Sequence, residues 1–320
     1  MICPPFFGLK SSPYPDFAAT PEFRYYKSCF LGSCLRQTSS VLYIAVDSLI
    51  PPRGKYFLGF HDFSAALDQA GVPAVWLTSR SRLQFDEPRR RLGHRHPFIA
   101  EDGCAVYLPE DYFHLRPDAP GGRSSKRTTL RLGRFTCIPI AEPLPTAADA
   151  LEALSEETGV AIVTLRSLSP RELSQNTGLP QREAELARQR DFDEIFFFAG
   201  ASDREIQRFL AEGRIRKLDL RPHQVLWSAA AGASTQRSIR ELSKLYDRAL
   251  HHHATTVGIA TADRASAVLP CCDRLILLQD PRLQSEETEK PESNRARSIE
   301  IPLLAPDVWE QVLEAVSPRM

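Results

Sequence analysis

Polar side chains follow apolar runs at three places in the chain, and their types suit the binding of an anion or a metal ion. Asp47 follows VLYIAV, Thr78-Ser79-Arg80 follows AVWL, and Asp263 ends GIATAD. A carboxylate can act as an acid or as a Mg²⁺ ligand, whereas hydroxyls, helix N–H groups and a guanidinium form an anion pocket. The structural alternatives are a solvated Asp, an Asp at a helix N-terminus and a helix cap.

The segments before these side chains predict strands of a parallel sheet. The runs VLYIAV (41–46) and AVWL (74–77) are apolar, as expected for strands buried on both faces. ATTVGIA (254–260) is also expected to be a strand. Between the first two lies DFSAALDQAGV, whose apolar residues have helical spacing and whose end is marked by Gly71. This order predicts a doubly wound α/β fold, which binds ligands beyond the carboxyl ends of its strands.

The middle of the chain predicts an inserted module of mixed helices and strands. TAADALEALSEETG (146–159) and DREIQRFLAEG (203–213) have helical patterns, and EIFFFAG (194–200) is a strongly apolar strand. The first residues of the chain are rich in Pro and aromatic side chains but have no period and no signal-peptide pattern. We therefore expect a poorly ordered extension over 1–40, a core over 41–112 and 215–320, and an α+β cap over 113–214.

Composition argues against a nucleic-acid or membrane partner. Lys+Arg and Asp+Glu both number 40, so the formal net charge is zero. No stretch has the apolar length that a bilayer span needs. The seven cysteines are scattered and odd in number, which disfavours a disulfide framework and a zinc site. We expect a reducing, cytoplasmic location. The oligomeric state is not predicted.

Four stretches of the sequence are informative together: LTSRSR (77–82), PFIAEDGCAVYLP (97–109), TGLPQREAELARQRDFDE (177–194) and SKLYDRA (243–249). In their order and spacing they resemble the haloacid dehalogenase superfamily of phosphatases and, more narrowly, its mannosyl-3-phosphoglycerate phosphatase group. The resemblance covers roughly residues 41–280 and implies a Rossmann-like core with the inserted module as its cap. It also implies Mg²⁺-dependent phosphatase chemistry.

The resemblance sets demands that this sequence meets only in part. In the family, a D-x-D-G-T motif supplies a nucleophilic Asp and an acid/base Asp, and a G-D-x-x-x-D turn supplies Mg²⁺ ligands. A Lys neutralises the phosphoryl oxygens, since a carboxylate approaches a phosphate dianion only with cations between them. Here Ala45 stands at the nucleophile, Ile259 at the first metal carboxylate, and Thr235 near the Lys position.

The remaining site residues follow from the same resemblance. Asp47 is the candidate acid/base and Thr78 the candidate catalytic hydroxyl, while Asp47 and Asp263 are the candidate metal ligands. Ser79 and Arg80 are candidates for binding the phosphoryl group. An alternative register makes Asp47 the nucleophile and puts Leu49 at the acid/base, but the small Ser48 and apolar Ile50 fit the first register better. Either register leaves the metal site short of ligands.

Further substrate contacts are implied for two other segments. Glu101 and Asp102 match a family segment that faces the substrate; the alternative is a plain hairpin turn. Arg188, Arg190 and Glu194 match a cap segment that would grip a glycerate carboxylate or sugar hydroxyls. The alternative for these three is a solvated helix face with ion pairs.

The sequence is compatible with three functions. The first is a catalytically impaired phosphatase relative that binds a phosphorylated sugar acid. The second is an active Mg²⁺-dependent phosphatase that acts on a glycosyl-3-phosphoglycerate through Asp47. The third is a non-catalytic regulatory or scaffold protein. Any cofactor would be Mg²⁺, in a site that we expect to be incomplete.

Overall fold

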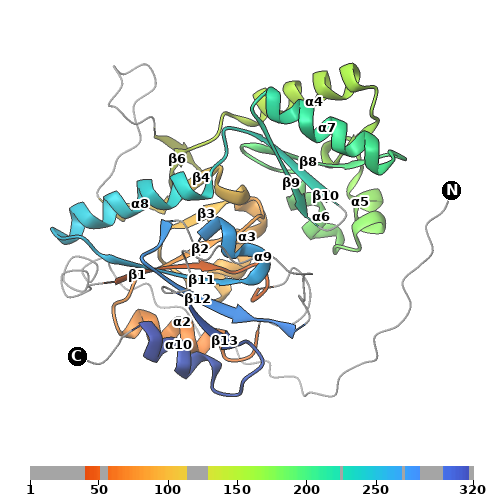
Figure 1. The fold of residues 1–320 in the computed structure, drawn as a ribbon. Coiled ribbons are helices and arrows are strands. Elements are labelled where there is room, and N and C mark those ends of the chain that lie inside the picture. The colour runs from red at the N-terminus through yellow and green to blue at the C-terminus, as the bar shows by residue number, and fades with distance from the viewer. Residues whose placement is uncertain are drawn as a thin grey trace.

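The computed structural model describes residues 40–50, 57–113, 129–223, 226–268, 271–281 and 298–316. The expected extension over 1–40 therefore lies, except for Ser40, outside the described residues. Within these ranges the chain forms a large and a small sheet, each flanked by helices (Figure 1). No helix in the described part is long and apolar enough to cross a bilayer.

The large sheet is mainly parallel, and its strand order changes direction at β1. Parallel neighbours run from β13 to β3, and an antiparallel extension of three strands follows. The order across the sheet is β13 (Ser298–Pro302), β12 (Arg274–Gln279), β11 (Thr255–Thr261), β1 (Ser40–Ala45), β2 (Ala74–Leu77), β3 (Phe98–Ala100), β4 (Ala105–Pro109), β6 (Phe135–Pro139) and β5 (Leu130–Leu132). The predicted doubly wound α/β class is confirmed.

Helices cover both faces of this sheet because alternate strand residues point to opposite sides. Val41, Tyr43 and Ala45 pack with the apolar face of α8, and Leu42 and Ile44 pack on the opposite side. Figure 1 shows α8 on one side of the sheet and α2 and α10 on the other. The flanking helices are α2 (Phe60–Gln69), α3 (Arg82–Arg91), α8 (Thr235–Leu250), α9 (Ala262–Val268) and α10 (Val308–Val316).

The small sheet is antiparallel and belongs to the inserted module. Its order is β7 (Ile162–Thr164), β8 (Asp193–Phe198), β10 (Leu226–Ala231) and β9 (Leu218–His223). The accompanying helices are α4 (Leu144–Thr158), α5 (Pro170–Thr177), α6 (Gln181–Ala187) and α7 (Asp203–Ile215), with one 3₁₀ turn, η3 (Leu165–Ser167). One apolar cluster joins α4 and α7 to the sheet through Leu154, Phe196 and Phe209.

The limits of the small sheet differ from those expected for the cap. Strands β5 and β6 lie within the expected range 113–214 but pair into the large sheet. Strands β9 and β10 lie beyond residue 214 but pair into the small sheet. The division of the chain into domains stays a prediction, and we use "cap" below for the small sheet and its helices.

Candidate functional site

The predicted polar residues meet at the carboxyl ends of β1, β2 and β11. Asp47 follows β1 by two residues, Thr78 follows β2 directly, and Thr261 ends β11. This edge is the point where the sheet order changes direction, the usual ligand position in a doubly wound fold. A cavity of about 30 Å³ lies there, lined by Ala45, Asp47, Leu77, Thr78, Ile99, Asp102, Gly103, Thr235, Arg264 and Val268.

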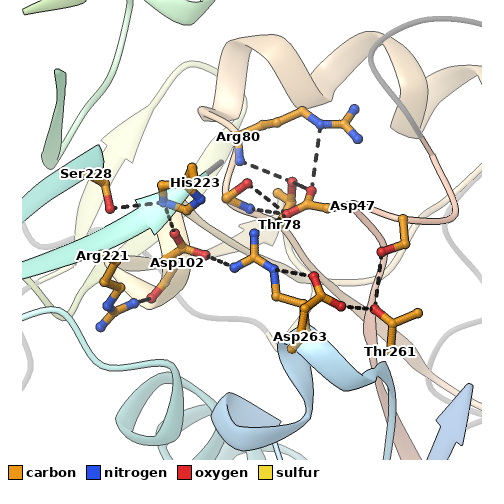
Figure 2. A network of polar contacts seen from close by, with 12 residues as sticks. Asp47, Thr78, Arg80, Asp102, Arg221, His223, Ser228, Thr261 and Asp263 are labelled. Atoms are coloured by element: carbon orange, nitrogen blue, oxygen red, sulfur yellow. Dashed lines mark hydrogen bonds and ion pairs between the residues drawn. The ribbon is translucent and has the colours of Figure 1, made fainter. Parts of the chain in front are cut away.

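The carboxylate of Asp47 receives hydrogen bonds from the segment that follows β2. Its Oδ1 accepts from the Thr78 hydroxyl at 2.5 Å, and its Oδ2 accepts from the backbone N–H and the hydroxyl of Ser79, each at 2.8 Å. Burial alone would raise the pKa of Asp47, but Arg80, Arg264 and these hydrogen bonds lower it. Asp47 is therefore an ionised carboxylate that already uses the local donors (Figure 2).

The helix cap beside this segment is Ser81. Its hydroxyl accepts from the N–H of Gln84 and the Gln84 side chain accepts from the Ser81 N–H, which together form a capping box. Thr78 and Ser79 are thus free of the capping role and direct their hydroxyls to Asp47. The guanidinium of Arg80 lies 3.7 Å from Asp47 Oδ1 and is 9% exposed.

The central cation of the site is Arg264, which the sequence analysis missed. Its Nη1 donates to Asp102 Oδ1 at 2.7 Å, and its Nη2 donates to Asp47 Oδ2 at 3.2 Å. Its Nε lies 3.9 Å from Asp263. The sequence offered one clue, because Arg264 directly follows Asp263 at the turn from β11 into α9. By contrast Arg237, two residues after Thr235 at the expected Lys position, is exposed.

Asp102 connects the core to the cap. His223 Nε2 of β9 lies 2.8 Å from Asp102 Oδ2, and the guanidinium of Arg221 donates to the Asp102 carbonyl. Burial would raise the pKa of Asp102, but His223, Arg264 and Arg221 lower it well below the usual range of a carboxyl group. Figure 2 shows His223, Arg221 and Ser228 on the cap side of this contact. Sequence patterns missed His223 and Arg221, whose segment was assigned to the core.

The residues present do not fit a Mg²⁺ ion, which prefers about six oxygen ligands in octahedral geometry. Ala45 has no donor atom, and Ile259 is fully buried in the core opposite Ile44. Asp263 accepts from Thr261 at 2.6 Å. Among the described residues, no three His, Cys, Asp or Glu side chains cluster so that they could hold a metal ion. The guanidinium of Arg264 would repel a divalent cation placed beside Asp47.

The alternative register, in which Asp47 is the nucleophile, leaves the site without an acid/base residue. Leu49, which that register puts at the acid/base position, is fully buried in the core. Ala45 and Asp47, the pair of the preferred register, both line the cavity. Thr235, at the expected Lys position, lines it too, but its hydroxyl donates to the Asp102 carbonyl at 2.9 Å. Thr235 contributes no charge.

Glu101 lies outside the cavity lining and is fully buried. Its carboxylate accepts the backbone N–H groups of Asp191, Phe192 and Asp193, at 2.8 to 3.2 Å. Burial and the neighbouring Asp193 raise its pKa. This placement gives no support to a substrate contact by Glu101. Its hydrogen bonds instead link the core to the cap. The segment 101–103 is the 3₁₀ turn η2 (Glu101–Gly103).

Of the three charged cap residues, Arg190 and Glu194 are buried in ion pairs, unlike the solvated helix face of the structural alternative. Arg190 is 6% exposed, pairs with Asp193 and donates to the Ser79 carbonyl at 2.7 Å. Glu194 is 2% exposed and pairs with Arg166, to whose carbonyl Arg188 donates at 3.0 Å. Helix α6 stops at Ala187 and β8 starts at Asp193, so Arg188 and Arg190 lie in the connection between them and Glu194 lies in β8. Ligand binding by these three residues stays a prediction.

Comparison with known proteins finds relatives among sugar-acid phosphatases, while no family model matches the chain. A glucosyl-3-phosphoglycerate/mannosyl-3-phosphoglycerate phosphatase of Methanococcoides burtonii is 24% identical over 218 residues, which cover 67% of this chain and 75% of the relative. A phosphatase of the same description from Persephonella marina is 24% identical over 227 residues, covering 70% of this chain and 79% of the relative.

Solved structures have the same fold. A haloacid dehalogenase-like hydrolase from Bacteroides thetaiotaomicron superposes with a TM-score of 0.56 at 10% identity and covers 87% of this chain and all of its own. At this identity the likeness concerns the fold alone. It includes the cap as well as the core, since the match spans nearly the whole described chain.

Proposed function

We propose that this chain, a member of the haloacid dehalogenase superfamily that is similar to mannosyl-3-phosphoglycerate phosphatases, binds a phosphorylated sugar acid without hydrolysing it efficiently. The observation that carries the proposal is Ala45, which lines the cavity at the position where the resemblance puts the nucleophile. A methyl group cannot attack phosphorus. The relatives act on glycosyl-3-phosphoglycerates, which suggests that class of ligand.

The donors beside Ala45 suit a phosphoryl group. The hydroxyls of Thr78 and Ser79 and the N–H of Ser79 donate to one carboxylate, that of Asp47. The guanidinium groups of Arg80 and Arg264 lie 3.7 Å and 3.2 Å from the same carboxylate. A phosphate carries the same kind of charged oxygen and would accept the same bonds. The site thus keeps the means to hold a phosphoryl group.

The candidate acid/base, Asp47, is poorly suited to proton transfer. Its arginine partners and hydrogen bonds lower the pKa of Asp47, and a general acid works best with a pKa near the operating pH. An ionised Asp47 would hardly protonate a leaving group. This supports binding over turnover.

The test combines thermal shift with phosphate release, using mannosyl- and glucosyl-3-phosphoglycerate on the full chain. A ligand that binds the native state raises its melting temperature. We expect stabilisation by these compounds and no phosphate release above background, with or without Mg²⁺. Absence of any shift would favour a regulatory or scaffold role. Release that Asp47→Asn abolishes would favour the active phosphatase.

A further inference from the structure

Arg264 sits between three carboxylates at the cavity edge. Its guanidinium bonds Asp102 at 2.7 Å and Asp47 at 3.2 Å, and it lies 3.9 Å from Asp263. Its side chain is 26% exposed and lines the cavity. Burial would lower the pKa of Arg264, but Asp102 and Asp47 raise it, so the group stays charged. The positively charged side chain of Arg264 thus lies where these three carboxylates converge.

Three of the four positions that would hold a metal ion offer no free side-chain oxygen, and the fourth, Asp263, already uses one of its two oxygens to accept from Thr261. Both oxygens of Asp47 already accept hydrogen bonds, from Thr78 and from Ser79. Ala45 and Ile259 supply no ligand at all. A divalent cation in reach of Asp47 would also approach a guanidinium fixed 3.2 Å from the same carboxylate.

A guanidinium can supply what a metal ion supplies to phosphate binding. It is planar, permanently charged, and presents several N–H donors in a fork that matches phosphate oxygens. Asp47 and Asp102 each hold one end of Arg264, which orients the group before any ligand arrives. A pre-oriented cation loses little freedom on binding.

We propose that Arg264 takes the place of a metal ion in this cavity, so that the site binds a phosphate monoester without any divalent cation. This inference rests on the proposed function, since it concerns the same ligand group. It adds that the positive charge comes from the protein, and that Mg²⁺ is excluded.

The test is calorimetric titration of the full chain with 3-phosphoglycerate and with inorganic phosphate, once with a chelator and once with excess Mg²⁺. We expect dissociation constants that agree within about twofold, since no metal takes part. Binding only with Mg²⁺ would overturn this inference and leave the proposed function standing. Absence of binding to these probes and to the glycosyl-3-phosphoglycerates, under both conditions, would overturn the proposed function and with it this inference.

The phosphate affinity of Arg264 variants provides a second test. Arg264→Gln should weaken phosphate binding at least about tenfold, and Arg264→Lys, which keeps the charge but loses the fork, should weaken it less. Arg131→Gln, at an exposed arginine of β5, is the matched control and should bind as the wild type does. Melting curves show whether each variant is folded. If folded Arg264→Gln binds as tightly as the wild type, the inference fails.

A third measurement needs no phosphate ligand. Titration with Mn²⁺ followed by electron paramagnetic resonance should detect no ion bound at this site in the wild type. A bound Mn²⁺ that Asp47→Asn removes would contradict the replacement of the metal by Arg264.

Discussion

Asp47 uses the donors that a bound phosphate would need. The Thr78 hydroxyl, the Ser79 N–H and the Ser79 hydroxyl all donate to its carboxylate, and the guanidinium groups of Arg80 and Arg264 lie beside it. A ligand phosphate would therefore compete with Asp47 for these groups. The carboxylate of Asp47 thus occupies the position of an anion bound by these donors.

Removing this carboxylate should strengthen phosphate binding. We expect Asp47→Ala to bind inorganic phosphate about tenfold more tightly in calorimetry, because its donors become available and a negative charge is lost. Without phosphate the variant should lose about 1–3 kcal/mol of stability, since buried donors lose their partner. Asp62→Ala, at an exposed position of α2, serves as the control. Weaker binding by Asp47→Ala would mean that the hold of Asp47 on Arg264 matters more than its competition for the donors.

Asp47 and Asp102 also predict how stability depends on pH. Both have a folded-state pKa below the ordinary value of 3.8. The cost of burial is outweighed by arginine partners and hydrogen bonds at Asp47, and by His223 and arginine partners at Asp102. Their contribution is complete above 3.8 and is lost as the pH falls through the lowered folded values.

The urea midpoint should therefore fall as the pH drops below 3.8, and Asp102→Asn should reduce the size of that fall. Asp62→Asn, on the exposed face of α2, should leave it unchanged. An equal fall in Asp102→Asn and the wild type would show that Asp102 carries none of this pH dependence.

At the scale of the element, the turn η2 determines where both neighbouring carboxylates point. Glu101 and Asp102 have φ values of 52° and 51°, which is uncommon for residues with a side chain. The Glu101 side chain reaches the cap backbone, while Asp102 reaches Arg264 and His223. The N-terminus of α8 packs on the same turn, because a Cβ on Gly103 would lie 2.3 Å from the Thr235 nitrogen.

Gly103→Ala tests this close approach. We expect a loss of about 3 kcal/mol or more in the free energy of unfolding, since the new Cβ meets backbone and cannot be relieved by a side-chain rotation. Gly93→Ala is a matched control: its φ is also positive, at 68°, but a Cβ there meets nothing within 4 Å. That variant should lose only about 1 kcal/mol. The free energy of unfolding is measured by urea denaturation. Similar losses in both variants would show that crowding at Gly103 matters little.

At the scale of the whole molecule, the segment 191–193 joins the core to the cap. Asp191 accepts from Arg82 and from the Tyr107 hydroxyl, both at 2.9 Å, and Glu101 binds the backbone N–H groups of the segment. Arg190 adds a bond to the Ser79 carbonyl. The cap is thus held beside the cavity by several polar contacts that are buried or partly buried.

Glu101→Ala should loosen this junction. The substitution leaves three backbone N–H groups without their acceptor, and we expect the amides of residues 191–193 to exchange at least about tenfold faster in hydrogen–deuterium exchange. In the control variant Glu152→Ala, on the exposed side of α4, the amides of residues 191–193 should exchange as in the wild type. Unchanged protection in Glu101→Ala would show that other contacts suffice to hold the segment.

Much of the core could be predicted from local patterns. Apolar runs bounded by Pro, Gly and polar residues placed β1, β2 and β11 to within a residue, because a strand buried on both faces needs such a run. The same runs located Asp47 and Thr78 at the carboxyl edge, and the absence of a carboxylate at Ala45 and Ile259 follows from residue identity alone.

Only the tertiary structure decided what these residues contact. Arg264 is 217 positions from Asp47 and 162 from Asp102, and no local pattern reports a pairing over such separations. Glu101 matched a substrate-facing segment, yet the packing of the cap buried it against backbone. A carboxylate's partner depends on which charges the fold brings within a few ångströms, so the sequence by itself determined which groups the site lacks, and the structure decided which cation stands there instead.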